Sequence, residues 1–426
     1  MLFDVIRHFL SLQRSQWFDK KKLSQIQAKK LASIISHAYN NVAFYRELYS
    51  SIGLNNSPRI EELPLITKEI IRAVPTEKLV SGGVITEEHQ VSYTSGSSGM
   101  PLKIIKNDRE AWYSDALRLR SLLAQGAKLT DKICTIRPVP IDKDFQIYRV
   151  TEKRRFYGFL KTSRVRPVPL SPDMRKHVEL FKMWRPQVLS TFPSYLVRLI
   201  DFCRSSETHL TFRMIRTQGE LLTEQTRKII EEFFQTRVFD SFGAAEVGHI
   251  AWECPTRVGY HVNSEAVFME VLRDGTPASP GEEGEIYVTT LYRYTMPFIR
   301  YNLGDIGVIL NDECPCGRGL PLISRIYGRV VDIIVRRDGV PVFPLTVLYT
   351  LQEIEGLHRF RVIQRSDYVI EVYIKPRQGL EDAVATEVEK RCRLLFPNTP
   401  FIIKTTDQFQ DDKIKFRPIV SYVKVS

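Results

Sequence analysis

The spacing of apolar residues in the first half of the chain predicts helices that alternate with short strands. Residues 24–39 place Ile26, Leu31 and Ile34 near helical spacing. Further helices are expected within 1–50 and over 109–125, 195–203 and 223–234, and strands are expected over 133–136 and 188–191. This alternation favours a parallel sheet covered by helices.

The pattern changes near residue 266, where consecutive strands replace the helices. Strands are expected over 266–272, 284–289 and 307–310, and Asp274 and Gly275 supply a turn between the first two. Short strands in direct succession indicate a distorted β-barrel-like region.

A third pattern follows residue 338. Strands at 360–363 and 368–374 precede a helix at 381–395, as in a small α+β domain. We therefore expect an α/β fold with a large N-terminal domain over 1–328 and a small mobile lid domain over 329–426. Residues 1–60 would form a helical lead-in to the large domain.

Composition narrows the class of protein. The 426 residues are 43% hydrophobic and 26% charged, which is typical of a globular protein. The sequence starts without a recognisable leader and contains no apolar run long enough for a membrane span, so we expect a cytoplasmic protein. The net charge of +12 includes local clusters that suit solvated surface or a polyanion such as a nucleotide or coenzyme A. No nucleic-acid module is recognisable, and a homodimer is one assembly to consider.

A segment rich in serine and glycine is the first candidate for chemistry. Its small and hydroxylated residues are Thr94, Ser95, Gly96, Ser97, Ser98 and Gly99. Glycine lets the backbone approach a ligand, and hydroxyl and N–H groups can surround an anion. The spacing fits neither the P-loop nor the dinucleotide-binding fingerprint. A phosphate-binding loop and a plain flexible turn are therefore both open at this point.

Cysteine and histidine residues form a second pattern. Cys254 precedes His261 by seven positions, and Cys314 and Cys316 flank one residue. Three thiolates and an imidazole suit tetrahedral zinc, although the spacing is not that of a zinc finger. His249 is a competing ligand, and reduced thiols without a metal are the alternative. We expect a structural metal.

Four further motifs follow the serine-rich segment in order. They lie at 218–220 (QGE), 240–246 (DSFGAAE), 300–305 (RYNLGD) and 328–332 (GRVVD). From about residue 60 to the C-terminus, the chain resembles the adenylate-forming superfamily of acyl-CoA synthetases. The resemblance is closest to phenylacetate-CoA ligases and to CapK-like proteins of capsular polysaccharide biosynthesis.

The resemblance implies a role for each motif. Thr94 to Gly99 would hold the β- and γ-phosphates of ATP, and Glu246 would hold Mg²⁺. The remaining implied nucleotide and carboxylate contacts are Gly219, Glu220, Phe242, Gly243, Asp305 and Arg329. Asp305 would accept hydrogen bonds from the ribose, and Arg329 would reach the ribose or a phosphate. Related proteins with cysteines at similar positions also imply a structural Zn²⁺.

The resemblance also implies a catalytic lysine near the C-terminus. It aligns with Lys415, where Ile414 replaces the usual glycine, and Lys413 is the alternative. Such a lysine would stabilise negative charge that develops as the acid attacks the α-phosphate. The lid would then rotate about residues 329–337.

The implied activity is AMP-forming ligation. A carboxylic acid, which the resemblance suggests is aryl, would be activated by MgATP as acyl-AMP and transferred to a thiol, with coenzyme A the leading acceptor. An acyl-AMP-dependent amide ligase acting on an amine or amino sugar, an adenylyltransferase and a non-catalytic nucleotide-binding scaffold are the alternatives. Tyr93, Phe192, Tyr195, Phe242 and Ala244 could line an acyl pocket, or they could be ordinary core residues.

Overall fold

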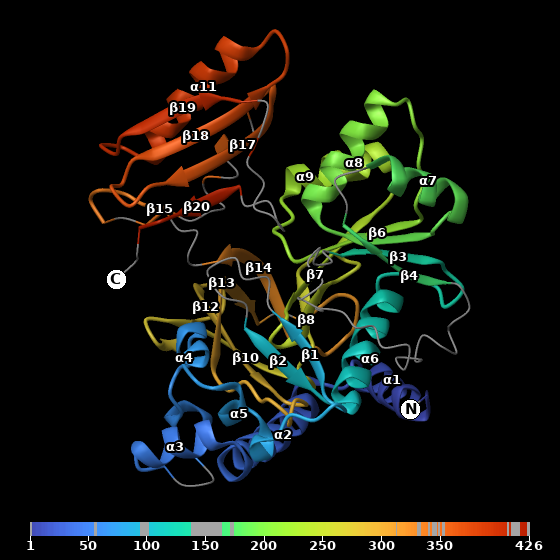
Figure 1. Ribbon diagram of the computed structural model, residues 1–426, viewed down its shortest axis with the longest axis vertical. Coiled ribbons are helices and arrows are strands. Elements are labelled where there is room, and N and C mark those ends of the chain that lie inside the picture. The colour runs from blue at the N-terminus through green and yellow to red at the C-terminus, as the bar shows by residue number, and fades with distance from the viewer. Residues whose placement is uncertain are drawn as a thin grey trace. The chain divides into compact units, whose positions relative to one another are not determined.

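The computed structural model divides into two compact units (Figure 1). It describes residues 2–54, 58–93, 102–137, 164–170, 174–311, 313–329, 334–339, 341–342, 347, 350–351, 354–406, 409 and 418–423. The larger unit comprises Met1–Gly219, Ile230–Leu303 and Gly307–Arg325, and the smaller one comprises Glu220–Ile229, Gly304–Ile306 and Ile326–Ser426. The predicted boundary after residue 328 stays a prediction.

Helices occur where the sequence predicts them, and further helices occur in the segment that follows the lead-in and over residues 174–184. The α-helices are α1 (Leu2–Ser15), α2 (Lys20–Asn41), α3 (Ala43–Ser51), α4 (Lys68–Arg72), α5 (Thr76–Leu79), α6 (Asp108–Ala124), α7 (Met174–Trp184), α8 (Pro193–Ser205), α9 (Glu224–Phe234) and α11 (Glu381–Leu395). Short 3₁₀ turns occur at η1 (Ile60–Glu62) and η2 (Ser81–Gly83). The side chain of Asp19 caps α2, and Asn107 and Glu110 form a capping box at α6.

A twelve-stranded sheet forms the centre of the larger unit. Its strands, in spatial order, are β11 (Thr276–Pro277), β10 (Val267–Arg273), β12 (Glu283–Thr290), β13 (Tyr301–Leu310), β14 (Leu322–Arg329), β9 (Tyr260–Val262), β8 (Gly248–Glu253), β7 (Val238–Ala244), β6 (Met214–Gln218), β5 (Val188–Thr191), β3 (Ile133–Arg137) and β4 (Val165–Pro169). Strands β4, β3, β5, β6 and β7 are parallel, as the helix–strand alternation predicts. Strand β8 pairs antiparallel with β7, and β9 pairs antiparallel with β8. The strands predicted to form a barrel-like region are thus continuous with the parallel half.

Two hairpins are described outside this sheet. Strands β1 (Gln90–Tyr93) and β2 (Lys103–Lys106) pair on either side of the serine-rich segment. Strands β15 (Ile334–Val335) and β16 (Pro341–Val342) pair in the smaller unit. The serine-rich residues 94–99, Lys413 and Lys415 lie outside the described residues.

A four-stranded sheet forms the smaller unit, as predicted for a small α+β domain. Its order is β19 (Phe401–Thr405), β18 (Ile370–Pro376), β17 (Leu357–Gln364) and β20 (Ile419–Ser421). Helix α11 covers one face, where Val384, Val388 and Cys392 are buried (Figure 1).

The N-terminal helices are firmly attached to the larger unit. Arg120 of α6 lies 2.7 Å from Glu265, both side chains are almost completely buried, and Ser15 donates a hydrogen bond to the same carboxylate. A side chain at Gly319 would overlap the carbonyl oxygen of Phe18, so only glycine allows this close approach. The lead-in is therefore part of the core.

Candidate functional site

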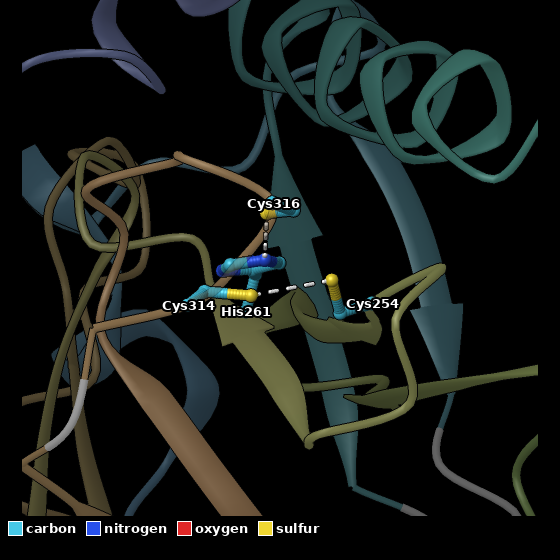
Figure 2. Close-up of side chains that lie close together, drawn as sticks. All are labelled: Cys254, His261, Cys314 and Cys316. Atoms are coloured by element: carbon cyan, nitrogen blue, oxygen red, sulfur yellow. Dashed lines mark hydrogen bonds between the residues drawn. The ribbon is translucent and has the colours of Figure 1, made fainter.

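Four side chains that the sequence singles out as metal ligands converge in the larger unit (Figure 2). Cys254 follows β8, His261 lies on β9, and Cys314 and Cys316 lie on the turn between β13 and β14. Their ligand atoms all lie within 4.8 Å of one another. The structure thus brings together the whole predicted set.

The distances fit a metal better than they fit a disulfide. The sulfur atoms of Cys254 and Cys314 are 3.4 Å apart, whereas a disulfide bond is about 2.05 Å long. Nε2 of His261 lies 3.2 Å from the sulfur of Cys316. Zinc–sulfur bonds of about 2.3 Å place tetrahedral ligand atoms about 3.8 Å apart. The ligand atoms would need only small shifts to reach this spacing around such an ion.

The electrostatics of the group also suit a metal. Burial lowers the pKa of His261 to about 4, so its imidazole is neutral at physiological pH and can coordinate a metal. Burial raises the pKa of Cys254 to about 12, so this thiol remains protonated unless a cation stabilises its thiolate. At Cys316, burial also acts to raise the pKa, but hydrogen bonds from Arg318 outweigh it and the pKa is lowered.

His249, the competing ligand, is not part of this group. Its Nε2 lies 3.2 Å from Nη2 of Arg216 and 3.0 Å from the hydroxyl of Ser121. The converging group consists of Cys254, His261, Cys314 and Cys316, which corrects the prediction that left His249 open as a ligand of this site.

Glu246, the predicted magnesium ligand, is buried and already has a cationic partner. Nζ of Lys68 lies 2.9 Å from its Oε1, and the hydroxyl of Tyr301 donates to the same oxygen over 3.1 Å. Burial acts to raise the pKa of Glu246, but the Lys68 ammonium and these two hydrogen bonds outweigh it and lower the pKa. The carboxylate is therefore ionised.

The backbone beside Glu246 is fixed by two further side chains. Arg293 donates to the carbonyl of Glu246 over 2.7 Å, and Tyr292 donates to the carbonyl of Val247 over 3.1 Å. Because Lys68 and Tyr301 both contact Oε1, neither of them occupies Oε2. The arrangement fits a carboxylate that offers one oxygen to a hard cation.

The structure places the other predicted nucleotide contacts in both units. Gly219, Phe242 and Gly243 belong to the larger unit, where Phe242 is partly exposed. Glu220 and Asp305 belong to segments of the smaller unit. Arg329 ends β14, and only its backbone is described. Their roles stay predictions.

Two aromatic residues considered for an acyl pocket are core residues instead. Tyr195 is 2% exposed and its hydroxyl lies 2.9 Å from Nδ1 of His177. Phe192 is also buried. Tyr93, Phe242 and Ala244 are partly exposed.

Sequence reasoning missed the residues that surround Glu246. Lys68 begins α4 and lies 178 positions before Glu246. No local pattern links the two, because the segment containing Lys68 reads as a connector. Tyr301 was noticed only as part of the RYNLGD motif.

The fold indicates the class of protein that this chain resembles. A crystal structure of 2-hydroxyisobutyryl-CoA ligase in the postadenylation state, in complex with R3-HIB-AMP, is similar with a TM-score of 0.81. The likeness covers 96% of this chain and 91% of that chain at 18% sequence identity, and it shows the fold of an adenylate-forming ligase. No known protein-family model matches the chain.

Sequence similarity then indicates which proteins of this class the chain resembles. Phenylacetate-coenzyme A ligase of Thermus thermophilus is 27% identical over 376 residues, covering 82% of this chain and 79% of the relative. Protein CapK of Staphylococcus aureus is 22% identical over 337 residues, covering 74% of this chain and 70% of CapK. The chain is thus similar in sequence to phenylacetate-coenzyme A ligases and to CapK. None of its described helices combines the length and apolar character needed to cross a bilayer.

Proposed function

We propose that this chain is an AMP-forming acid–thiol ligase. A carboxylate oxygen would attack the α-phosphorus of ATP, the bond to pyrophosphate would break, and acyl-AMP would form. The sulfur of coenzyme A would then attack the acyl carbon, and AMP would leave. The observation that carries the proposal is the similarity to phenylacetate-coenzyme A ligases along 82% of the chain, with Glu246 buried and ionised in its motif.

Residues of this chain have distinct tasks in the proposal. Glu246 would hold Mg²⁺, which neutralises phosphate charge when bound. Lys68 and Tyr301 would orient the Glu246 carboxylate through Oε1. Lys415 would stabilise charge at the α-phosphate, with Lys413 the alternative.

The proposed nucleotide contacts follow the motifs. Thr94 to Gly99 would hold the outer phosphates, Asp305 the ribose, and Arg329 the ribose or a phosphate. Gly219, Glu220, Phe242 and Gly243 would line the adenine and carboxylate positions.

We further propose a structural zinc ion held by Cys254, His261, Cys314 and Cys316. Support comes from the convergence of three sulfur atoms and a neutral imidazole, which is a donor set that favours zinc over hard cations. The proposal implies a reducing compartment such as the cytoplasm, because the ligands must remain thiols.

Exchange of pyrophosphate into ATP tests the ligase proposal. Purified protein is expected to catalyse exchange that depends on an added acid, across a panel of aryl and alkyl carboxylic acids, and then to form the CoA thioester. Glu246→Gln should slow exchange about 10²–10³-fold, since it removes one preorganised charge. Glu69→Gln is the matched control, because that carboxylate is exposed on α4.

Three outcomes are decisive. No acid-dependent exchange by the parent protein would contradict the ligase proposal. Exchange followed by transfer to an amine instead of coenzyme A would identify the amide ligase. Full activity of Glu246→Gln would contradict the metal role of Glu246 alone, and comparing Lys415→Ala with Lys413→Ala identifies the lysine.

A further inference from the structure

A polar cluster lies between helix α6 and the sheet of the larger unit. It comprises Ser121 of α6, Arg216 of β6, Ser241 of β7 and His249 of β8. Arg216 is 3% exposed, and its guanidinium contacts the hydroxyls of Ser121 and Ser241 and the imidazole of His249. A buried cluster of this kind must satisfy its polar groups internally or through a ligand.

The cluster fixes the tautomer of His249. A guanidinium carries only donors, so the Nη2 of Arg216, 3.2 Å away, requires Nε2 of His249 to accept. Burial, with Arg216 and Arg118 nearby, lowers the pKa of His249 well below its usual value. The imidazole is therefore neutral, and its single proton is on Nδ1.

Within the described part of the chain, Nδ1 of His249 has no hydrogen-bond partner. Both hydrogen-bond contacts of His249 use Nε2, and no described residue accepts a hydrogen bond from Nδ1. The side chain is partly exposed, whereas Arg216 and Ser121 are buried. A fixed donor that no described residue engages is suited to an acceptor atom on a ligand.

His249 also lies beside the position expected for the acid. It pairs with Gly243 across β7 and β8. Gly243 belongs to the motif that, in the proposed function, lines the carboxylate. A donor at His249 is therefore placed to meet an atom of the acid outside its reacting carboxylate.

We propose that His249 recognises a hydroxyl group on the carboxylic acid that this chain activates, and that Arg216 is its positioning residue. The inference rests on the proposed function. A hydroxyl oxygen fits better than a second carboxylate for two reasons. The donor is a neutral N–H group, and Arg216 directs its Nε and Nη2 groups to Ser241, Ser121 and His249 while the charge of Asp240 lies near it.

Matched pairs of acids test this selectivity through acid-dependent pyrophosphate exchange. Suitable pairs are isobutyrate with 2-hydroxyisobutyrate, and phenylacetate with its 2-hydroxy and 4-hydroxy derivatives. The parent protein should prefer the hydroxylated member of at least one pair by about 10-fold or more in kcat/KM. His249→Leu should reduce that preference to about 2-fold or less, mainly by raising KM for the hydroxylated acid.

Three variants separate recognition from structure. His249→Gln retains a side-chain N–H donor and should keep part of the preference. His209→Leu is the matched control, because His209 is exposed, and should keep all of it. Arg216→Met removes the donor that fixes the tautomer, so the proton is no longer confined to Nδ1 and part of the preference should be lost.

The outcomes are distinguishable. Equal use of both members of every pair by an active parent protein would overturn the inference and leave the ligase proposal intact. An unchanged preference in His249→Leu would also overturn it. Absence of exchange with every acid would overturn the ligase proposal, and this inference with it.

Discussion

The cysteine–histidine group and the Glu246 site are both buried in the larger unit, but they differ in what balances their charge. The first has four ligand atoms that converge, three of them sulfur. The second has one carboxylate, and Lys68 already provides an ammonium 2.9 Å away. The first arrangement offers a soft donor set for an ion, whereas the second carboxylate is already balanced by Lys68.

If both proposed ions bind, this difference predicts two different modes of metal binding. A complete soft donor set holds an ion permanently and stabilises the fold. A single carboxylate with its own counter-ion binds a hard cation weakly, and the cation would arrive with the phosphates of the substrate. The two sites should therefore respond differently to chelators and to substitution.

Removing a cysteine ligand is expected to have the largest effect. Cys314→Ser should reduce bound zinc from about one equivalent to nearly none, measured by mass spectrometry of the metal. Unfolding free energy should fall by several kcal/mol, since metal binding in structural sites contributes about 10 kcal/mol or more in the best-studied small domains.

Cys203→Ser is the matched control for this experiment. Cys203 is equally buried but lies on α8, outside the cysteine–histidine group. Its replacement should leave the metal content unchanged. Parent protein that is purified without metal, and that is as stable after chelation as before, would contradict the zinc proposal.

The sequence predicted the cysteine–histidine group better than it predicted the Glu246 site. Cysteine pairs are conspicuous because thiols are rare, and zinc chemistry requires all four ligands together. Lys68 is not conspicuous in the sequence, because lysine is abundant on protein surfaces. Only the fold brings Lys68 next to Glu246. Partners that are chemically ordinary and distant in sequence cannot be read from a pattern.

The same reasoning explains the prediction of the fold. Periodicity identified most helices and the parallel strands, because it follows from burial of one face. The sequence pattern left His249 open as a metal ligand, because a pattern does not show that the imidazole contacts Arg216. The sequence left Tyr195 open as a pocket residue or a core residue, and its burial and its hydrogen bond to His177 place it in the core.

Removing the Lys68 ammonium, the cationic partner of Glu246, should have the second largest effect on stability. Lys68→Met leaves a buried carboxylate without its counter-ion, and unfolding free energy should fall by about 2 kcal/mol. That value is reduced because Lys68 is 20% exposed. Adding Mg²⁺ without ATP should restore part of the melting temperature in this variant and change the parent protein little.

Lys78→Met supplies the control for that measurement. Lys78 pairs with Glu47 at the same 2.9 Å distance, but both side chains are about half exposed. A surface pair of this kind contributes about 0–1 kcal/mol. If Mg²⁺ stabilises Lys68→Met no more than it stabilises the parent protein, then Glu246 is not a metal ligand in the free enzyme.

The smallest effect is expected at Tyr301, whose hydroxyl only orients the carboxylate. Tyr301→Phe removes the 3.1 Å hydrogen bond to Glu246 and keeps the ring, which packs against Phe298. We expect a loss of about 1 kcal/mol in stability. The Mg²⁺ concentration for half-maximal exchange should rise about 10-fold, the lower end of the range for groups that orient a metal ligand.

Tyr45→Phe distinguishes orientation from general destabilisation. Tyr45 is fully buried, and its hydroxyl donates to the backbone carbonyl of Pro297 over 3.0 Å. Its hydrogen-bond acceptor is therefore not a carboxylate. It should lose similar stability with no change in the Mg²⁺ requirement. Equal Mg²⁺ requirements in the two variants would show that Tyr301 is a packing residue, and the Glu246 site would then depend on Lys68 alone for its orientation.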